Sequence, residues 1–250
     1  MIILETIAVA FSMFSAIPMP HVDWNEKNLR YSLCAFPLVG LVTGLAMWLW
    51  QRVCFRCDLP ALLRGAGLCL LPVMLTGGIH LDGYADTWDA LASHGGQDQK
   101  QQILKDPHIG TFAVVRLCMY FVAELALWTA SGPVRLPVLT GLFMLSRSLS
   151  GLALTVFPLR EGSGLARSFA EASDRKRVRT LLLVLSVLLA LLLSLNGAWE
   201  AVPAAAGVGL VYYRMCEKTF GGLSGDLAGW FLQTAELWML AALLLRQLIG

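Results

Sequence analysis

The sequence predicts an all-α protein: a polytopic transmembrane helical bundle of about seven spans, with six to eight as the range. Of its 250 residues, 57% are hydrophobic and only 14% are charged, and the mean hydropathy is +0.65. A chain with so few polar side chains cannot coat a soluble globule. The formal charge of +2 excludes intrinsic disorder and leaves no basic excess for binding nucleic acid. The lipid bilayer is therefore the first predicted partner.

Seven segments have the apolar character of spans that cross a hydrocarbon core about 30 Å thick: residues 33–49, 61–79, 111–130, 136–157, 181–199, 201–213 and 228–249. The run at 201–213 is short and rich in Ala and Gly, which suits close helix packing. Residues 1–17 lack the basic leading region and cleavage site of a signal peptide, and they either cross the bilayer or lie at its interface. No linker, low-complexity tract or repeat divides the chain, so residues 1–250 are predicted to form one domain.

The connections between these spans fall into two sets. One set is long, polar and rich in lysine and arginine: residues 18–31, 80–110, 158–179 and 214–227. The opposite set is short and holds four arginines: Arg52, Arg56, Arg64 and Arg135. Basic loops tend to stay in the cytoplasm, so we place the long set there, although the rule is not obeyed cleanly. Nearly every acidic or phosphate-seeking residue then lies on the cytoplasmic face.

Three aspartates lie where the second apolar run meets that face. Asp82, Asp86 and Asp89 stand at positions i, i+4 and i+7, which fall within an arc of roughly 60° on a helix. Like charges on one face repel, so the arrangement costs free energy unless a cation lies among them. Oxygen-only ligands favour Mg²⁺ or Mn²⁺ over zinc. The pattern predicts a metal site, and the alternative is a set of aspartates that cap and solvate a helix end.

Glycines accompany these acids. Gly77, Gly78 and Gly83 flank Asp82, and without side chains they let a ligand or another backbone approach closely. We therefore expect them to contact the substrate or its phosphate.

A second polar cluster precedes the third span. Lys105 can supply a point charge to a phosphate, and Asp106 can accept a hydrogen bond or join the metal site. The alternative is that Lys-Asp-Pro forms an ordinary turn leading into a helix.

Two more stretches complete the face. Arg160 follows the fourth span, and its guanidinium can clamp a phosphate, although the positive-inside tendency would also explain it. Asp226 stands at the entrance to the last span, next to Gly225. It is either a helix N-cap or part of the metal or phosphate site.

Five motifs are spread along most of the chain: F-P-L-V-G-L-V-T-G at 36–44, G-G-I-H-L-D-G-Y-A-D at 77–86, K-D-P-H-I-G-T-F at 105–112, R-E-G-S-G at 160–164 and G-G-L-S-G-D at 221–226. Together they resemble the cobalamin synthase family, also called adenosylcobinamide-GDP ribazoletransferases, and the acidic motif is the most specific of them. Two positions depart from the family pattern. His108 replaces a usual arginine, which puts a phosphate contact there in doubt, and Trp88 replaces a small residue.

The resemblance implies an Mg²⁺-dependent transferase of substituted phosphate groups, which performs the last assembly step of the cobalamin nucleotide loop. Adenosylcobinamide-GDP is joined to alpha-ribazole or its 5′-phosphate, and GMP leaves. It also implies the bacterial cytoplasmic (inner) membrane, and it leaves open a homo-oligomer or contacts with other cobalamin-pathway enzymes. Carried onto this sequence, the metal ligands are Asp82, Asp86, Asp89 and Asp226; the catalytic groups are Asp89, Lys105 and Asp106; and the contacts to substrate or phosphate are Gly77, Gly78, Gly83, Arg160 and Gly225.

Two other functions also place acids on membrane helices. CDP-alcohol phosphotransferases carry an Ala-Arg pair after their first D-G and a later G-x-x-x-D-x-x-x-D, whereas here Ala85 is followed by Asp86 and no such second half exists. Cation-coupled transporters place their acids near the bilayer midplane, at broken helices related by an internal repeat. Here the acids cluster at predicted helix ends and no repeat is visible.

Overall fold

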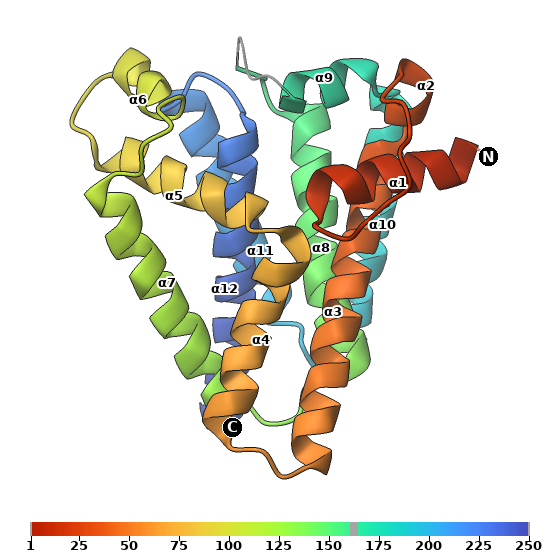
Figure 1. Cartoon of the computed structure of the whole chain (residues 1–250), viewed down its shortest axis with the longest axis vertical. Coiled ribbons are helices and arrows are strands. Elements are labelled where there is room, and N and C mark those ends of the chain that lie inside the picture. Colours follow the sequence, from red (N-terminus) through yellow and green to blue (C-terminus); the bar gives the residue numbers. More distant parts are fainter. Residues whose placement is uncertain (1, 161–164, 250) are drawn as a thin grey trace.

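The computed structural model describes residues 2–160 and 165–249, and in that part of the chain the structure is helical (Figure 1). The helices are α1 (Ile2–Phe14), α2 (Glu26–Leu29), α3 (Ser32–Arg56), α4 (Ala61–Thr76), α5 (Ile79–Ala92), α6 (Gln97–Ile103), α7 (Thr111–Ala130), α8 (Leu136–Val156), α9 (Leu165–Ala172), α10 (Arg175–Leu195), α11 (Ala201–Lys218) and α12 (Gly225–Ile249). The only β-structure in the described residues is one isolated bridge between Leu159 and Leu223. The predicted all-α class is confirmed.

Among the described residues, five helices are long and apolar enough to cross a membrane: α3, α7, α8, α10 and α12. Helices α4 and α5 add a sixth span only as a broken pair, because they are bent by 96° relative to each other. The polytopic bundle is therefore confirmed, and this count is close to the predicted one. The predicted run at 201–213 lies in α11, which packs against α12 but carries three charged residues near its end, Arg214, Glu217 and Lys218.

Helix α1 lies across the upper end of the bundle in Figure 1 and packs against α3. Its 13 residues extend only about 20 Å, which is too short for a hydrocarbon core of about 30 Å. Phe11 packs with Phe36, Val39 and Leu232 in a small cluster of buried side chains. Of the two alternatives for the first apolar segment, the structure therefore favours the interfacial one.

The span predicted at 181–199 has different ends. Helix α10 begins at Arg175, because the Asp174 carboxylate caps it by accepting a hydrogen bond from the backbone N–H of Arg177 over 3.3 Å. It ends at Leu195, four residues early. Hydropathy alone missed both ends. The helix includes a basic first turn and stops at the C-cap Asn196, because hydrogen bonds rather than apolarity determine where it begins and ends.

A buried ion pair joins α8 to α12 inside the bundle. The Arg147 side chain is only 1% exposed and pairs with Glu236, to which the Ser146 hydroxyl also donates a hydrogen bond over 2.6 Å. Glu236 lies about 15 Å along α12 from Asp226 at 1.5 Å per residue. In the described residues neither side chain forms an ion pair with any other residue, so the pair fixes the register between these two helices.

Candidate active site

A two-glycine bend sets the direction of the acidic helix. Gly77 (φ 65°) and Gly78 (φ 81°) both have left-handed backbone conformations, which residues with a Cβ rarely adopt. Helix α5 consequently leaves α4 at 96° and runs across the bundle towards α6, near the upper end in Figure 1. We call this the acidic end. With 14 residues and a direction at 96° to α4, α5 is not itself a span, and Asp82 lies on its first turn.

Helices α5 and α12 touch backbone to backbone. A Cβ on Gly83 would lie 2.7 Å from the Asp226 Cα, and a Cβ on Gly229 would lie 2.6 Å from the His80 carbonyl oxygen. Both distances are too short for any side chain, so glycine is required on both helices. This contact places Asp82 next to Asp226, two acids that are far apart in the sequence.

A cavity of about 290 Å³ opens beside this contact. Five predicted site residues line it: Asp82, Gly83, Arg160, Gly225 and Asp226. Gly77 and Gly78 line a second cavity of about 360 Å³, which also reaches Asp82. The structure thus brings together predicted residues from three separate stretches of the chain, with Asp82 between the two cavities.

Arg160 is the most unusual side chain in the cavity. It is 5% exposed, and its Nε and Nη1 atoms are buried without a hydrogen-bond partner in the described residues. The Arg160 backbone N–H donates to the Leu223 carbonyl over 3.1 Å, and the Leu223 N–H donates to the Pro158 carbonyl over 2.8 Å. These two bonds fasten the connection after α8 to the connection before α12. Residues 161–164, the rest of the R-E-G-S-G motif, lie outside the described residues.

Unpaired guanidinium N–H groups carry a desolvation penalty, which an anion in the cavity would remove. The guanidinium also interacts electrostatically with the carboxylate of Asp226. The cavity therefore combines a buried cation with carboxylates, an arrangement that suits a phosphate accompanied by a metal ion.

The carboxylates share one electrostatic field. Burial, followed by the charges of Asp82, Asp226 and Asp89, raises the pKa of Asp86 to about 7. Among the described residues, no three His, Cys, Asp or Glu side chains are arranged to hold a metal ion. The donor set still fits Mg²⁺, which typically uses one or two protein carboxylates and completes its shell with water and phosphate. That all four aspartates bind one ion stays a prediction.

Asp89 faces a different neighbour from Asp82. Its carboxylate lies directly against Gly110, in the space that a Cβ would fill. Gly110 is the N-cap of α7, so this carboxylate lies at a helix N-terminus, where negative charge is stabilised. The roles of Asp89 as a metal ligand or as a base stay predictions.

Lys105 and Asp106 do not line the cavity; both are exposed in the connection between α6 and α7. The Asp106 carboxylate accepts a hydrogen bond from the His108 backbone N–H over 3.0 Å and lies 2.7 Å from the ring Nδ1 of His108. These hydrogen bonds hold the pKa of Asp106 below its ordinary value. The geometry matches the turn that was the alternative reading of Lys-Asp-Pro, and the catalytic roles of both residues stay predictions.

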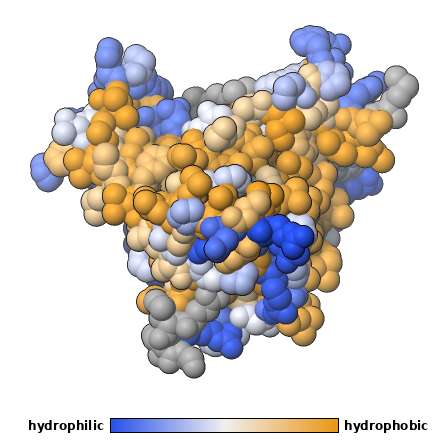
Figure 2. Space-filling model, turned by 60° about the horizontal axis from the view of Figure 1, so that its bottom comes forward, coloured by the Kyte–Doolittle hydropathy of each residue, from blue (hydrophilic) through white to orange (hydrophobic). Residues whose placement is uncertain are grey.

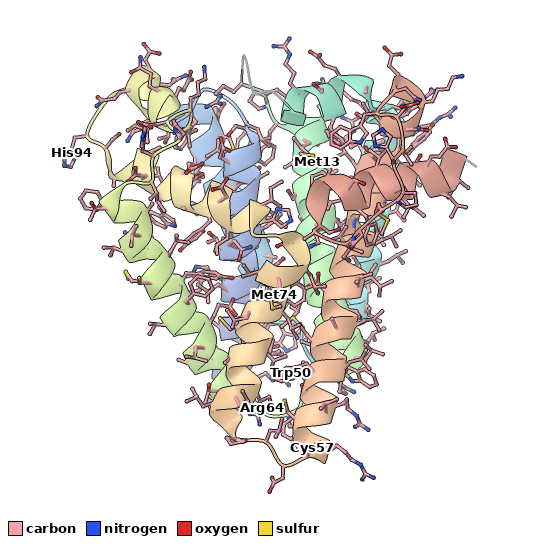
Figure 3. All side chains as sticks on the ribbon, viewed as in Figure 1. Met13, Trp50, Cys57, Arg64, Met74 and His94 are labelled. Carbon is pink, nitrogen blue, oxygen red and sulfur yellow. The ribbon has the colours of Figure 1, made fainter. Side chains whose placement is uncertain are left out.

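Three polar residues of the cavity were not assigned to the site from the sequence: His80, Ser150 and Ser224. His80 is buried and its Nε2 atom has no partner in the described residues, while the Ser224 hydroxyl donates to Asp226 Oδ2 over 3.3 Å. On a helix His80 points away from Asp82, and the sequence does not show that α12 approaches on that side. The sequence signal that could have assigned His80 to the site is its position in the acidic motif at 77–86. His94, in contrast, projects outward from the bundle (Figure 3).

Comparison with known proteins gives a consistent result. Residues 6–244 match the family model described as cobalamin-5-phosphate synthase. An adenosylcobinamide-GDP ribazoletransferase from Lachnoclostridium phytofermentans is 34% identical over 94% of this chain and 91% of its own length. A relative of the same name from Pseudomonas putida (strain W619) is 36% identical over 95% of this chain and 97% of its own length. Another, from Clostridium perfringens (strain SM101), is 29% identical over 93% of this chain and 94% of its own length. No solved structure matches the chain.

Proposed function

We infer the function of this chain from its family: the chain belongs to the cobalamin-5-phosphate synthase family. We propose that it transfers the adenosylcobinamide-phosphate part of adenosylcobinamide-GDP to alpha-ribazole or alpha-ribazole 5′-phosphate and releases GMP. This is the final assembly of the nucleotide loop in cobalamin biosynthesis. The shared name of its relatives, adenosylcobinamide-GDP ribazoletransferase, supports the proposal.

The observation that carries the proposal in the structure is the buried guanidinium of Arg160, whose Nε and Nη1 atoms have no hydrogen-bond partner among the described residues. It lies in the same cavity as Asp82 and Asp226. In the proposed reaction the ribazole hydroxyl oxygen forms a bond to the phosphorus attached to cobinamide, and the bond between that phosphorus and the GMP oxygen breaks. Arg160 donates hydrogen bonds to the pyrophosphate and stabilises the charge that develops on the leaving GMP.

The carboxylates divide the remaining tasks. The hydroxyl proton passes to a carboxylate, for which we propose Asp89 as the base. Lys105 and Asp106 are exposed and are therefore available to a substrate that extends beyond the cavity. We propose Mg²⁺ as the cofactor, held by one or two of Asp82, Asp86 and Asp226; when bound, it supplies positive charge to the pyrophosphate oxygens.

We propose that the acidic end faces the cytoplasm of a bacterium and that the protein resides in the inner membrane. The support comes from α10, whose first turns carry four basic residues: Arg175, Lys176, Arg177 and Arg179. Basic residues next to a span keep that end in the cytoplasm, and the start of α10 lies at the acidic end (Figure 1).

The test is GMP release by the purified protein in detergent, with both substrates and Mg²⁺ present. Asp82→Asn removes one charge from the site without changing packing, and we expect turnover to fall at least about 100-fold. Arg160→Lys keeps the charge but loses the forked donor geometry, and we expect kcat/KM to fall about tenfold or more. Asp23→Asn removes a carboxylate that is also exposed but lies outside the cavity, and it is the control.

Wild-type turnover and unchanged Mg²⁺ dependence in Asp82→Asn would refute the proposed role of the acids. If the wild type transported cations across liposomes and released no GMP, the transporter alternative would replace the enzyme.

A further inference from the structure

At the end of the bundle opposite α5, three arginines surround a cavity of about 640 Å³. Arg52 and Arg56 lie on the last turns of α3, Arg135 is the N-cap of α8, and all three are exposed. Cys57, the residue after α3, marks the lower tip of the molecule in Figure 3. Figure 2 brings this end forward and shows strongly hydrophilic residues gathered beside hydrophobic side surfaces. We call it the arginine cavity.

Hydrogen bonds hold the two parts of the cavity together. The side chain of Gln51 is buried, and its amide both accepts from the Val134 N–H over 3.0 Å and donates to the Val134 carbonyl. Arg135 in turn donates to the Asn196 carbonyl. The segment before α8 is thereby fixed against the end of α3, and Arg135 is held near Arg52 although like charges repel.

In the described residues, no carboxylate lies within ion-pair distance of these arginines. None of the three arginines forms an ion pair there. Glu200, at this end of the bundle, is paired with Arg246 over 2.8 Å. Three guanidinium groups around one cavity therefore create a positive potential that favours an anion.

Arg64, a further arginine at this end, has a different explanation. It is only 8% exposed and donates hydrogen bonds to the Thr129 and Ser131 carbonyls over 3.4 and 2.7 Å. Its role is to join α4 to the end of α7. A purely structural role of this kind does not extend to the exposed Arg52 and Arg56, for which no side-chain hydrogen bond is found in the described residues.

The depth of the cavity indicates what kind of anion it meets. Helix α3 has 25 residues and is about 37 Å long, so a hydrocarbon core of about 30 Å leaves its end at the lipid headgroups. Trp48 and Phe55 line the cavity, and aromatic side chains are typical of this interface. On the same turns the side chains of Leu49 and Val53 are 56% and 50% exposed and face outward. The cavity thus has a basic rim, apolar walls and an outlet at the headgroup level.

We propose that the arginine cavity binds the phosphate headgroup of an anionic phospholipid in the leaflet opposite the acidic end. The guanidinium groups donate paired hydrogen bonds to the phosphodiester oxygens, and the aromatic walls contact the glycerol and the upper acyl chain. A free phosphate ion would use the arginines but not these walls. The net positive charge of the cavity selects anionic over zwitterionic lipids.

The test uses the full-length protein in nanodiscs of phosphatidylcholine, with and without phosphatidylglycerol, and native mass spectrometry to count bound lipid. We expect the wild type to retain phosphatidylglycerol in preference to phosphatidylcholine. Arg52→Gln/Arg56→Gln/Arg135→Gln should weaken that binding on the order of 100-fold, at about fivefold for each charge removed. The corresponding triple lysine variant keeps the charge and should retain most of the preference, which separates loss of binding from loss of folding.

The matched control removes three exposed basic charges that lie at the acidic end but outside the start of α10: Lys27→Gln, Arg214→Gln and Lys218→Gln. This control should leave phosphatidylglycerol binding unchanged. The proposal would be overturned if the wild type retained the two lipids equally, or if the control lost as much phosphatidylglycerol binding as the triple glutamine variant of the cavity. Displacement of the lipid by inorganic phosphate would also overturn it. None of these readouts depends on GMP release, so the result is independent of the proposed function.

Discussion

The contact between α5 and α12 makes Gly83 a sensitive position. A Cβ there would lie 2.7 Å from both the Cα and the carbonyl oxygen of Asp226, and 3.1 Å from its carbonyl carbon. All three neighbours are backbone atoms, so no side chain can rotate away to make room. Gly83→Ala therefore requires the two helices to move apart.

The size of this movement follows from ordinary contact distances. Carbon atoms pack about 3.5–4.0 Å apart, so α5 and α12 must separate by roughly 1 Å at this point. Such a displacement separates Asp82 on one helix from Asp226 on the other. A misplacement of about 1 Å in an active site can lower the rate about 100-fold, whereas an overpacked contact costs about 1–3 kcal/mol of stability. We therefore expect a large loss of turnover in a protein that still folds.

The assay is steady-state GMP release by Gly83→Ala, normalised to folded protein by size-exclusion chromatography and thermal unfolding. The matched control is Gly132→Ala, because a Cβ at Gly132 meets no atom within 4 Å. The control should have wild-type turnover and stability. Wild-type turnover in Gly83→Ala, or a loss no larger than its loss of folded protein, would show that the helix contact does not position the acids.

Two further predictions concern stability. Glu236→Leu leaves the Arg147 guanidinium unpaired in the bundle and should lower the free energy of unfolding by about 3–5 kcal/mol, whereas the double variant Arg147→Met/Glu236→Leu should recover most of that stability. Thermal unfolding in detergent measures both variants, and an equal loss of stability in the single and the double variant would contradict the pairing. The N–H of Arg177, helped by Arg30, lowers the pKa of the Asp174 carboxyl. The contribution of this carboxylate to stability is complete above the ordinary carboxyl pKa and is lost as pH falls through the lowered pKa. The difference in Tm between wild type and Asp174→Asn should therefore shrink on acidification, and a difference independent of pH would contradict this.

Hydropathy predicted the bundle because membrane spans obey a one-dimensional rule: enough apolar residues in a row to cross the core. It failed where hydrogen bonds or backbone conformation decide. The apolar run at 61–79 continues through the Gly77–Gly78 bend, and composition does not reveal that the chain turns there by 96°. The capped start of α10 at Asp174 is a second case. Local composition indicates which segments enter the membrane, but caps and bends determine where they end.

The helical spacing predicted that the aspartates of α5 lie close together, and their membership of one site stays a prediction. It placed Asp82 and Asp86 in one electrostatic field, which the structure supports. It could not predict that Asp89 lies against Gly110, because that contact depends on how α7 approaches α5. The burial of Arg160 depends likewise on a bridge between two loops that are distant in the sequence. Spacing within one helix is a local property, whereas the cavity is made by contacts between elements.

The arginines of the short loops also explain why the positive-inside rule was not obeyed cleanly. Arg64 is buried among backbone carbonyls, so its charge is already engaged by the protein. Arg52, Arg56 and Arg135 surround one cavity, and lipid phosphates there would neutralise them after insertion. The four basic residues at the start of α10, in contrast, directly precede an apolar run and are placed to determine orientation as the rule requires. Removing the three cavity arginines should therefore leave the topology unchanged, whereas reversing the charge of the α10 start should disturb it. Labelling of Cys57 from either side of the membrane distinguishes the two outcomes, because that thiol is exposed at the tip of the arginine-bearing end.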